Sequence, residues 1–167
     1  MHLLKKMLRV TAEETAREHT TYTPPRWFNG AIRWILRSPM HALVSKDMML
    51  ITVTGRKTGT EYTLPVSYAR EGDIVICSAD RSRGWWKNVR SGDTVTLQLC
   101  GRKVPGRAKV ISEDKEALIK GMETMLVQVP RDAKHVDVRL DENNRPLAED
   151  LVRATDFRII IEIQELS

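Results

Sequence analysis

The feature that most constrains this chain is a change of hydrophobic period at Met48. Upstream, apolar residues recur at helical spacing, but from Met48 onward apolar and polar residues alternate with a period of two, as in half-buried strands. Such runs occupy residues 48–54, 61–69, 73–78, 94–100, 103–111 and 157–164. Short turns between most of these runs favour antiparallel pairing. Six strands in so short a chain predict a small barrel.

Helices are expected outside this barrel. The segment 112–126 begins with acidic residues, which suit a helix N-terminus, and a shorter helix is expected at residues 85–90. Residues 1–38 are expected to form an amphipathic N-terminal helix and a second helix that ends before Pro39. The predicted fold class is therefore α+β, a mainly antiparallel six-stranded barrel decorated by helices.

A chain of 167 residues with 41% hydrophobic content fits a single domain with one core. The expected parts of this domain are N-terminal helices at 1–38, a barrel core at 48–111, a helix and lid-like segment at 112–150, and a closing strand at 157–164. Residues 127–150 are polar and show no clear period, which leaves two alternatives, a lid or a loop wrapped on the surface.

Charge and hydropathy limit the classes of partner. The chain has 27 Lys+Arg against 22 Asp+Glu, a net charge of +5. This mild excess suits an anionic ligand but does not predict a nucleic-acid partner. No run approaches the roughly 20 apolar residues of a membrane span, and no secretory signal is evident, so a cytoplasmic protein is expected. The N-terminal helix is expected to pack on the barrel, with weak binding to the inner face of a membrane as the alternative.

Cysteine and metal chemistry play no part in the predicted function. Cys77 and Cys100 each end a strand-like run and lack CxxC or His-rich spacing. Both are therefore expected to be buried, reduced thiols. No constellation of residues with metal-ligand spacing is present in the sequence.

A doubly basic turn, GRKTG at residues 55–59, joins the first two runs. It can be a simple hairpin loop in which Gly59 adopts a left-handed conformation and the charges face water. It can also be a phosphate seat, because turn N–H groups would converge there with the Arg56 guanidinium and the Lys57 ammonium. It is not a P-loop, because a strand follows where a helix should begin. The residues of the turn leave both alternatives open.

Two further stretches suggest a ligand cavity. Pro65 lies inside a strand, where its missing N–H is expected to interrupt the ladder and leave neighbouring backbone groups free to face a planar ring. Trp85 and Trp86 begin a helix, and neighbouring helical residues point about 100° apart. One tryptophan is therefore expected to pack in the core and the other to border a cavity, with two hydrophobic joints as the alternative.

The stretch SPMHALVSKDMMLITVTGRKTGTEYTLPVSY, followed by a strand, a serine-containing loop, WWKN and a GR hairpin, resembles the deazaflavin-dependent nitroreductase family, also called the quinone-reductase-like family. The resemblance covers residues 38–110 and is most specific at GRKTG. It implies a split β-barrel related to FMN-binding pyridoxamine-phosphate oxidase-like proteins, often a homodimer. It also implies an oxidoreductase that transfers hydride from reduced coenzyme F-420 to a small electrophile such as a quinone, enone or nitroaromatic. FMN in the same seat is the alternative cofactor.

The resemblance also implies a set of site residues. The phosphate would be bound by Gly55, Arg56, Lys57, Thr58 and Gly59. Backbone contacts along the deazaflavin ring would come from Pro65, Val66 and Ser67, with Trp85 and Asn88 at the following helix. Ser78 is the catalytic candidate, because a hydroxyl there would meet negative charge that develops on the substrate oxygen.

Two departures from the family pattern matter. A shorter loop, ADRSRG, replaces the family's glycine-rich basic loop, which leaves two alternatives: Arg81 or Arg83 substitutes for its lysine, or the site is altered. The tyrosine-rich substrate segment of the nitroimidazole-reducing members is absent, so the identity of the substrate does not transfer. A non-catalytic carrier of a cofactor, haem or lipid is therefore kept as an alternative from another functional class.

Overall fold

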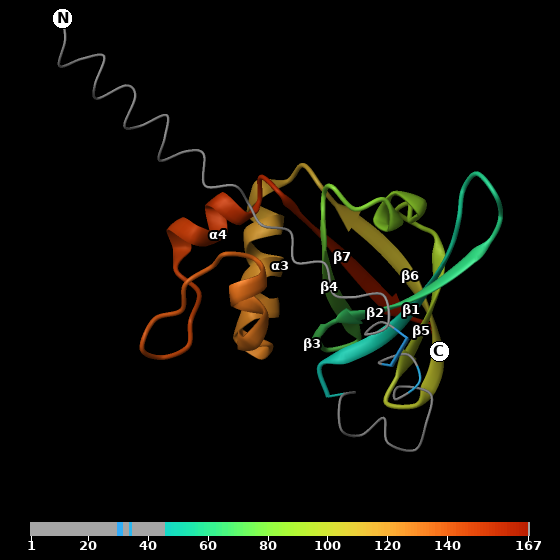
Figure 1. The fold of residues 1–167 in the computed structure, drawn as a ribbon, viewed down its shortest axis with the longest axis horizontal. Coiled ribbons are helices and arrows are strands. Elements are labelled where there is room, and N and C mark those ends of the chain that lie inside the picture. The colour runs from blue at the N-terminus through green and yellow to red at the C-terminus, as the bar shows by residue number, and fades with distance from the viewer. Residues whose placement is uncertain (1–29, 32–33, 35–45, 167) are drawn as a thin grey trace, which may run out of the picture.

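The computed structural model describes residues 30–31, 34 and 46–166 (Figure 1). Its strands are β1 (Met48–Thr54), β2 (Glu61–Ser67), β3 (Ala69–Glu71), β4 (Ile74–Asp80), β5 (Thr94–Leu99), β6 (Arg102–Ile111) and β7 (Arg158–Glu165). Its helices are η2 (Trp85–Asn88), α3 (Lys115–Gln128), η3 (Pro130–His135) and α4 (Ala148–Ala154). The expected amphipathic N-terminal helix lies outside the described residues. Of the second expected helix, Gly30, Ala31 and Trp34 are described and are helical.

The strands form a seven-stranded sheet in the order β2-β1-β5-β6-β7-β4-β3, and all neighbours in it are antiparallel. The two edge strands, β2 and β3, are separated in the sequence only by Tyr68. One bent stretch of chain therefore pairs with β1 through its first half and with β4 through its second half. This arrangement rolls the sheet into a barrel and leaves a seam between β2 and the far half of β4.

The α+β class, the antiparallel barrel and the outer helices are confirmed, but the sheet has seven strands where six were expected. The difference arises within the run 61–69, which the structure divides at Tyr68. The Tyr68 N–H donates to the carbonyl of Asp47 at 3.0 Å, and the tyrosine side chain is buried in the barrel. A bend at Tyr68 lets one alternating run serve as two strands.

Strand alternation supplies two cores. In β7, Ile159, Ile161 and Ile163 face the barrel interior, whereas Ile160 faces outward. The outer core around Ile160 includes side chains of α3, of α4 and of the intervening segment, and Figure 1 shows the two helices gathered on one side of the sheet. None of the helices in the described part of the chain is long and apolar enough to span a membrane.

Residues 127–150 include η3 and the start of α4 and are anchored to the outer core through the buried side chains of Ala133, Val136 and Val138. The carboxylate of Asp150, which is 0% exposed, fixes the end of this segment. It accepts hydrogen bonds from the N–H, Nε and Nη2 of Arg139 at 2.9, 2.8 and 3.0 Å. These bonds lower the pKa of Asp150 to about 2.

The two cysteines occupy different environments. Cys77 is fully buried in the barrel interior, and this burial raises the pKa of its thiol to about 12. Cys100 is exposed, so the expectation that both thiols are buried is wrong for this residue. It lies just after β5, at the tight turn into β6, where it adopts a positive φ of 47°. A turn residue projects from the barrel although the run that leads to it is buried.

Candidate functional site

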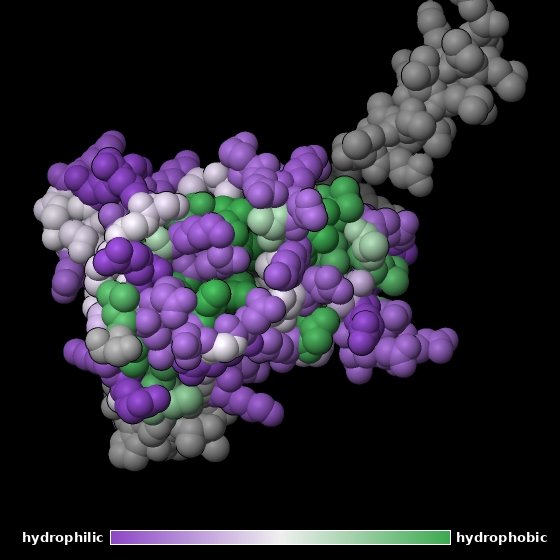
Figure 2. Space-filling view, turned by 180° about the vertical axis from the view of Figure 1, so that it is seen from behind, coloured by the Kyte–Doolittle hydropathy of each residue, from purple (hydrophilic) through white to green (hydrophobic). Residues whose placement is uncertain are grey.

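A pocket lies between β2 and η2. Figure 2 shows hydrophobic residues between hydrophilic ones on one face of the molecule. Over the whole described surface, the exposed large hydrophobic residues are Trp34, Tyr62, Val127 and Val152. Of these, Tyr62 lines the pocket, whose volume of about 480 Å³ is typical of small-molecule sites. The pocket is lined by Glu61, Tyr62, Thr63, Leu64, Trp85 and Asn88.

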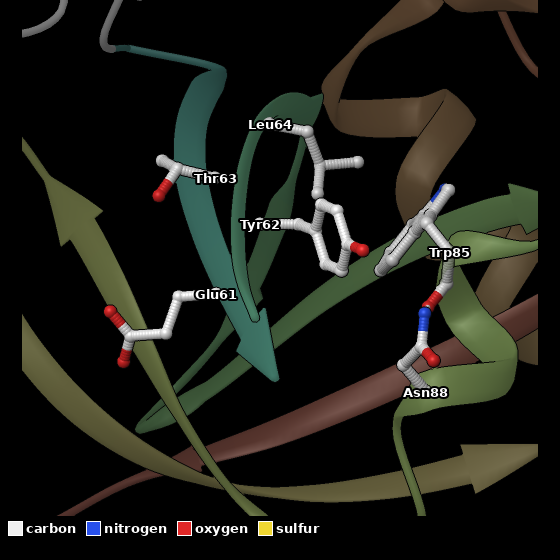
Figure 3. A pocket seen from close by; sticks show the side chains of 6 residues that line it. All are labelled: Glu61, Tyr62, Thr63, Leu64, Trp85 and Asn88. Carbon is white, nitrogen blue, oxygen red and sulfur yellow. The ribbon is translucent and has the colours of Figure 1, made fainter. Parts of the chain in front are cut away.

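The side chains of β2 divide between its two faces at this pocket. Figure 3 shows Tyr62 and Leu64 on the side of the strand that faces Trp85, with Glu61 and Thr63 on the opposite side. The phenol ring of Tyr62 stands between the strand and the indole of Trp85. The pocket therefore has an aromatic wall on each side, which suits a planar ligand group.

The basic turn 55–59 is closed by its own backbone. The N–H of Gly55 donates to the carbonyl of Thr60, and the N–H of Gly59 donates to the carbonyl of Gly55, both at 2.8 Å. Gly59 has φ +68°, the left-handed conformation that the sequence predicted for it. Arg56 and Lys57 are exposed at the tip, and within the described residues neither side chain forms an ion pair. Their charges remain available to a ligand.

The turn is held against the pocket by Asn88. The N–H of Arg56 donates to Asn88 Oδ1 at 3.2 Å, and Asn88 Nδ2 donates to the carbonyl of Trp85 at 3.2 Å. Gly55 is buried beneath the ring of Tyr62, and a Cβ at Gly55 would lie 2.7 Å from Tyr62 Cε2. A larger residue at Gly55 would have to displace the Tyr62 ring, and the basic turn lies beside the aromatic pocket.

The backbone of β2 offers a free edge. Pro65 lies opposite Leu50 in a ladder that runs without a break from Met48 to Thr54, so the expected interruption of this ladder by Pro65 does not occur. Antiparallel pairs alternate in hydrogen bonding, and counting from the bonded pair Gly55 and Thr60 places Pro65 at a position whose backbone faces the outer edge. An edge strand tolerates proline for this reason.

Ser78 lies apart from the pocket. Its neighbours Cys77 and Ala79 belong to the barrel interior, so alternation places Ser78 on the outer face of β4. The hydroxyl is half-buried and accepts a hydrogen bond from Arg158 Nη2 at 2.8 Å. The structure does not bring Ser78 among the residues that line the pocket, and its catalytic role remains a prediction.

Arg158 is the partner that sequence reasoning missed. Its side chain is 16% exposed, and its Nη1 lies 3.9 Å from Oδ2 of the buried Asp80. Burial lowers the pKa of Arg158, and the charge of Asp80 opposes this effect. The signal in the sequence is slight, a single cation at the start of the apolar run RIIIEI. Only the register of β4 with β7 places this cation near Ser78.

The two arginines proposed to replace the family's lysine do not line the pocket. Arg81 donates from Nη2 to the carbonyls of Ser112 and Thr155, the latter at 3.2 Å. Its guanidinium therefore ties the end of β4 to the segments that flank α3 and α4. Arg83 is half-buried in the next turn, where its N–H donates to the carbonyl of Asp80 at 3.0 Å.

The two tryptophans of η2 both pack partly against the barrel core, and Trp85 also lines the pocket. The ammonium of Lys87 lies 5.9 Å from the ring centre of Trp86, a distance compatible with a cation–π contact. Across the part of the chain that the structure describes, no group of three or more His, Cys, Asp or Glu side chains could hold a metal ion.

Comparisons with known proteins give a family match and several similar folds. The family model described as F420H2-dependent quinone reductase matches residues 37–140. Comparison with curated proteins gave no significant match. A candidate 5-nitroimidazole antibiotic resistance protein from Bacteroides thetaiotaomicron shares the fold with a TM-score of 0.51 and 12% identity, over 87% of this chain and 82% of that chain. The protein Atu2129 from Agrobacterium tumefaciens, of unknown function, has a TM-score of 0.52 and 13% identity, over 88% and 59%.

Proposed function

We propose that the electron acceptor of this protein is a small oxygen-bearing electrophile, because the chain belongs to the F420H2-dependent quinone reductase family. A quinone is the first candidate substrate, and an enone or a nitroaromatic is the second. The family makes the protein an oxidoreductase with coenzyme F-420 as its cofactor. One observation supports the proposal above the others. An exposed dibasic turn lies directly beside an aromatic pocket and is fixed to it by Asn88.

The residues present fit an anionic cofactor with a planar ring. Arg56 and Lys57 would hold its phosphate together with the N–H groups of the turn, since neither side chain is committed to an ion pair within the described residues. The free backbone edge of β2 at residues 65–67 would lie along the ring, with Trp85 at its side. Tyr62, which sequence reasoning did not select, would complete the wall of the pocket.

Reduced coenzyme F-420 supplies a hydride when it is bound, and the protein supplies position and electrostatics. The rigid attachment of the turn to η2 keeps the anion seat at a fixed distance from the pocket, which restricts how a bound molecule can lie. On the outer face of β4, the hydroxyl of Ser78 would donate to the substrate oxygen as negative charge develops there.

The first experiment is a fluorescence titration of the purified protein with oxidised coenzyme F-420 and with FMN at one salt concentration. Arg56→Ala and Lys57→Ala should each weaken F-420 binding by more than about 1 kcal/mol, or more than about fivefold in Kd, because each removes a charge-assisted contact. Arg107→Ala, an exposed arginine on β6, is the matched control and should leave Kd unchanged. Unchanged affinity in both turn variants would contradict the phosphate seat.

Turnover separates the enzyme from a carrier. In the protein loaded with reduced F-420, the cofactor should become oxidised when a quinone is added. Measurements of kcat/KM over a panel of quinones, enones and nitroaromatics would then rank the acceptors. Tight binding of F-420 with no oxidation by any member of the panel would refute the proposed substrate class and favour a carrier.

A further inference from the structure

The hydroxyl of Ser78 has a fixed orientation. A guanidinium has N–H donors and no acceptor, so in the 2.8 Å contact with Arg158 Nη2 the serine oxygen must be the acceptor. The hydroxyl proton therefore points away from Arg158. Among the described residues no acceptor takes this proton, and Ser78 is only half-buried. A hydrogen-bond donor is therefore left on a side chain that is partly exposed.

The group that fixes Ser78 is itself fixed. Asp80, two residues along β4, lies 3.9 Å from Arg158 Nη1, and its Oδ1 accepts from the N–H of Ser82 at 2.9 Å. The register of the sheet sets this arrangement, because Asp80 pairs with Arg158 and Ser78 pairs with Ile160. The three polar side chains lie on one face of two paired strands, and strands hold side chains more rigidly than loops do.

A cation that donates to a hydroxyl also strengthens it as a donor. Hydrogen bonds from ionised groups are stronger than neutral ones, and a chain of such bonds polarises its members in a buried setting. Arg158 is 16% exposed, so water screens its charge weakly. The Ser78 hydroxyl should therefore bind an oxygen that carries partial negative charge more tightly than an isolated serine would.

We propose that Arg158 is a positioning residue that orients and polarises the Ser78 hydroxyl as a donor to the acceptor oxygen of the electrophilic substrate. This inference rests on the proposed function. A quinone that accepts a hydride from reduced F-420 becomes a hydroquinone monoanion while the cofactor is oxidised. The hydride bonds to one end of the conjugated system, and the negative charge lies on the carbonyl oxygen at the other end, which then takes a proton from water. Ser78 stabilises this oxygen while its charge develops, and Arg158 acts through Ser78.

A double-mutant cycle tests the linkage. The variants are Ser78→Ala, Arg158→Met and the double variant, with Arg158→Lys to retain the charge and Arg107→Met as a control that removes an exposed arginine. Each single site variant should lower kcat/KM for a quinone by roughly 100-fold, as removal of an oxyanion donor does. The double variant should be no worse than either single variant, because both remove the same interaction.

Two further measurements separate positioning from structural damage. Urea midpoints report folding, and Kd for oxidised F-420 reports the cofactor seat, which should change less than threefold because the seat is formed by the turn 55–59. Arg158→Lys should recover part of the lost kcat/KM. If Arg158→Met does not fold, the cycle with Ser78→Ala is run with Arg158→Gln, which removes the charge but keeps a polar side chain beside Asp80.

The outcomes are distinct. Multiplicative losses in the double variant, or normal kcat/KM in Arg158→Met, overturn the role of Arg158 and leave the reductase intact. A wild-type protein that binds F-420 but reduces no quinone overturns the proposed function, and this inference with it. Coupled losses with retained folding and cofactor affinity support it.

Discussion

Replacement of Asp150 by Asn should remove a stabilising contribution that depends on pH. The carboxylate is wholly excluded from solvent and accepts from three groups of Arg139, while Arg153 Nη1 lies 3.0 Å from Oδ1. An amide in this place presents an NH₂ group to the Arg139 donors. The variant therefore loses at least one charge-assisted bond and gains a contact between donors.

The magnitude follows from the pKa of Asp150, which hydrogen bonding to Arg139 lowers from 3.8 to about 2. A depressed folded-state pKa contributes stability that is present above the unfolded-state value and is lost as the pH falls through the folded-state value. The difference corresponds to about 2 kcal/mol at neutral pH, which is an upper value because Arg139 is 63% exposed and salt screens its charge.

Urea denaturation of the wild type and of Asp150→Asn at a series of pH values measures this contribution. The difference in unfolding free energy should be largest near pH 7, begin to fall below about pH 5, and be reduced most near pH 2. Glu149→Gln, at an exposed position next to it, is the control and should show a much smaller difference. A difference for Asp150→Asn that stays constant with pH would refute the electrostatic origin.

Three other predictions concern packing, thiol reactivity and assembly. A Cβ at Gly106 would overlap Cγ2 of the buried Ile163, so Gly106→Ala should lower the free energy of unfolding measured in urea by roughly 1–3 kcal/mol. Gly84→Ala, at a position with open space, should change this free energy by less than about 1 kcal/mol. Equal midpoints would argue against a tight contact between β6 and β7. Iodoacetamide should modify Cys100 in the folded protein and Cys77 only after unfolding, and modification of both at equal rates would contradict the barrel interior. The homodimer implied by the family resemblance should appear in sedimentation equilibrium, where a monomer at all concentrations would count against it.

The strands could be predicted from the sequence because a period of two is a local property. The expected runs overlap all seven strands, and the missing strand boundary at Tyr68 reflects a bend that alternation does not reveal. The helices η3 and α4 were not predicted. Both lie within or at the end of a polar stretch, and α4 is fixed by the distant pairing of Asp150 with Arg139 rather than by a regular apolar stripe. In this segment the local sequence pattern does not determine whether a helix forms, and tertiary contacts do.

The candidate site divides in the same way. The turn and the left-handed Gly59 follow from a few adjacent residues. The tryptophan pair is not divided between core and cavity as expected, because both rings pack partly against the barrel core and Trp85 also lines the pocket. The position of Tyr62 against Trp85 depends on closure of the barrel, and the pairing of Arg158 with Ser78 joins residues separated by 80 positions. Contacts of this kind require the register of the sheet, which alternation alone does not supply.

The free edge of β2 has a consequence for association between chains. A barrel that closes through one bent stretch leaves few unpaired backbone groups, but the seam beside β2 exposes a row that another strand could extend. Pro65 has no N–H to give to an incoming strand, and its backbone faces this edge. The residue that keeps the edge open to a small ligand therefore also blocks continuous strand addition there. Its replacement by Val would add an N–H to this outer edge and favour aggregation.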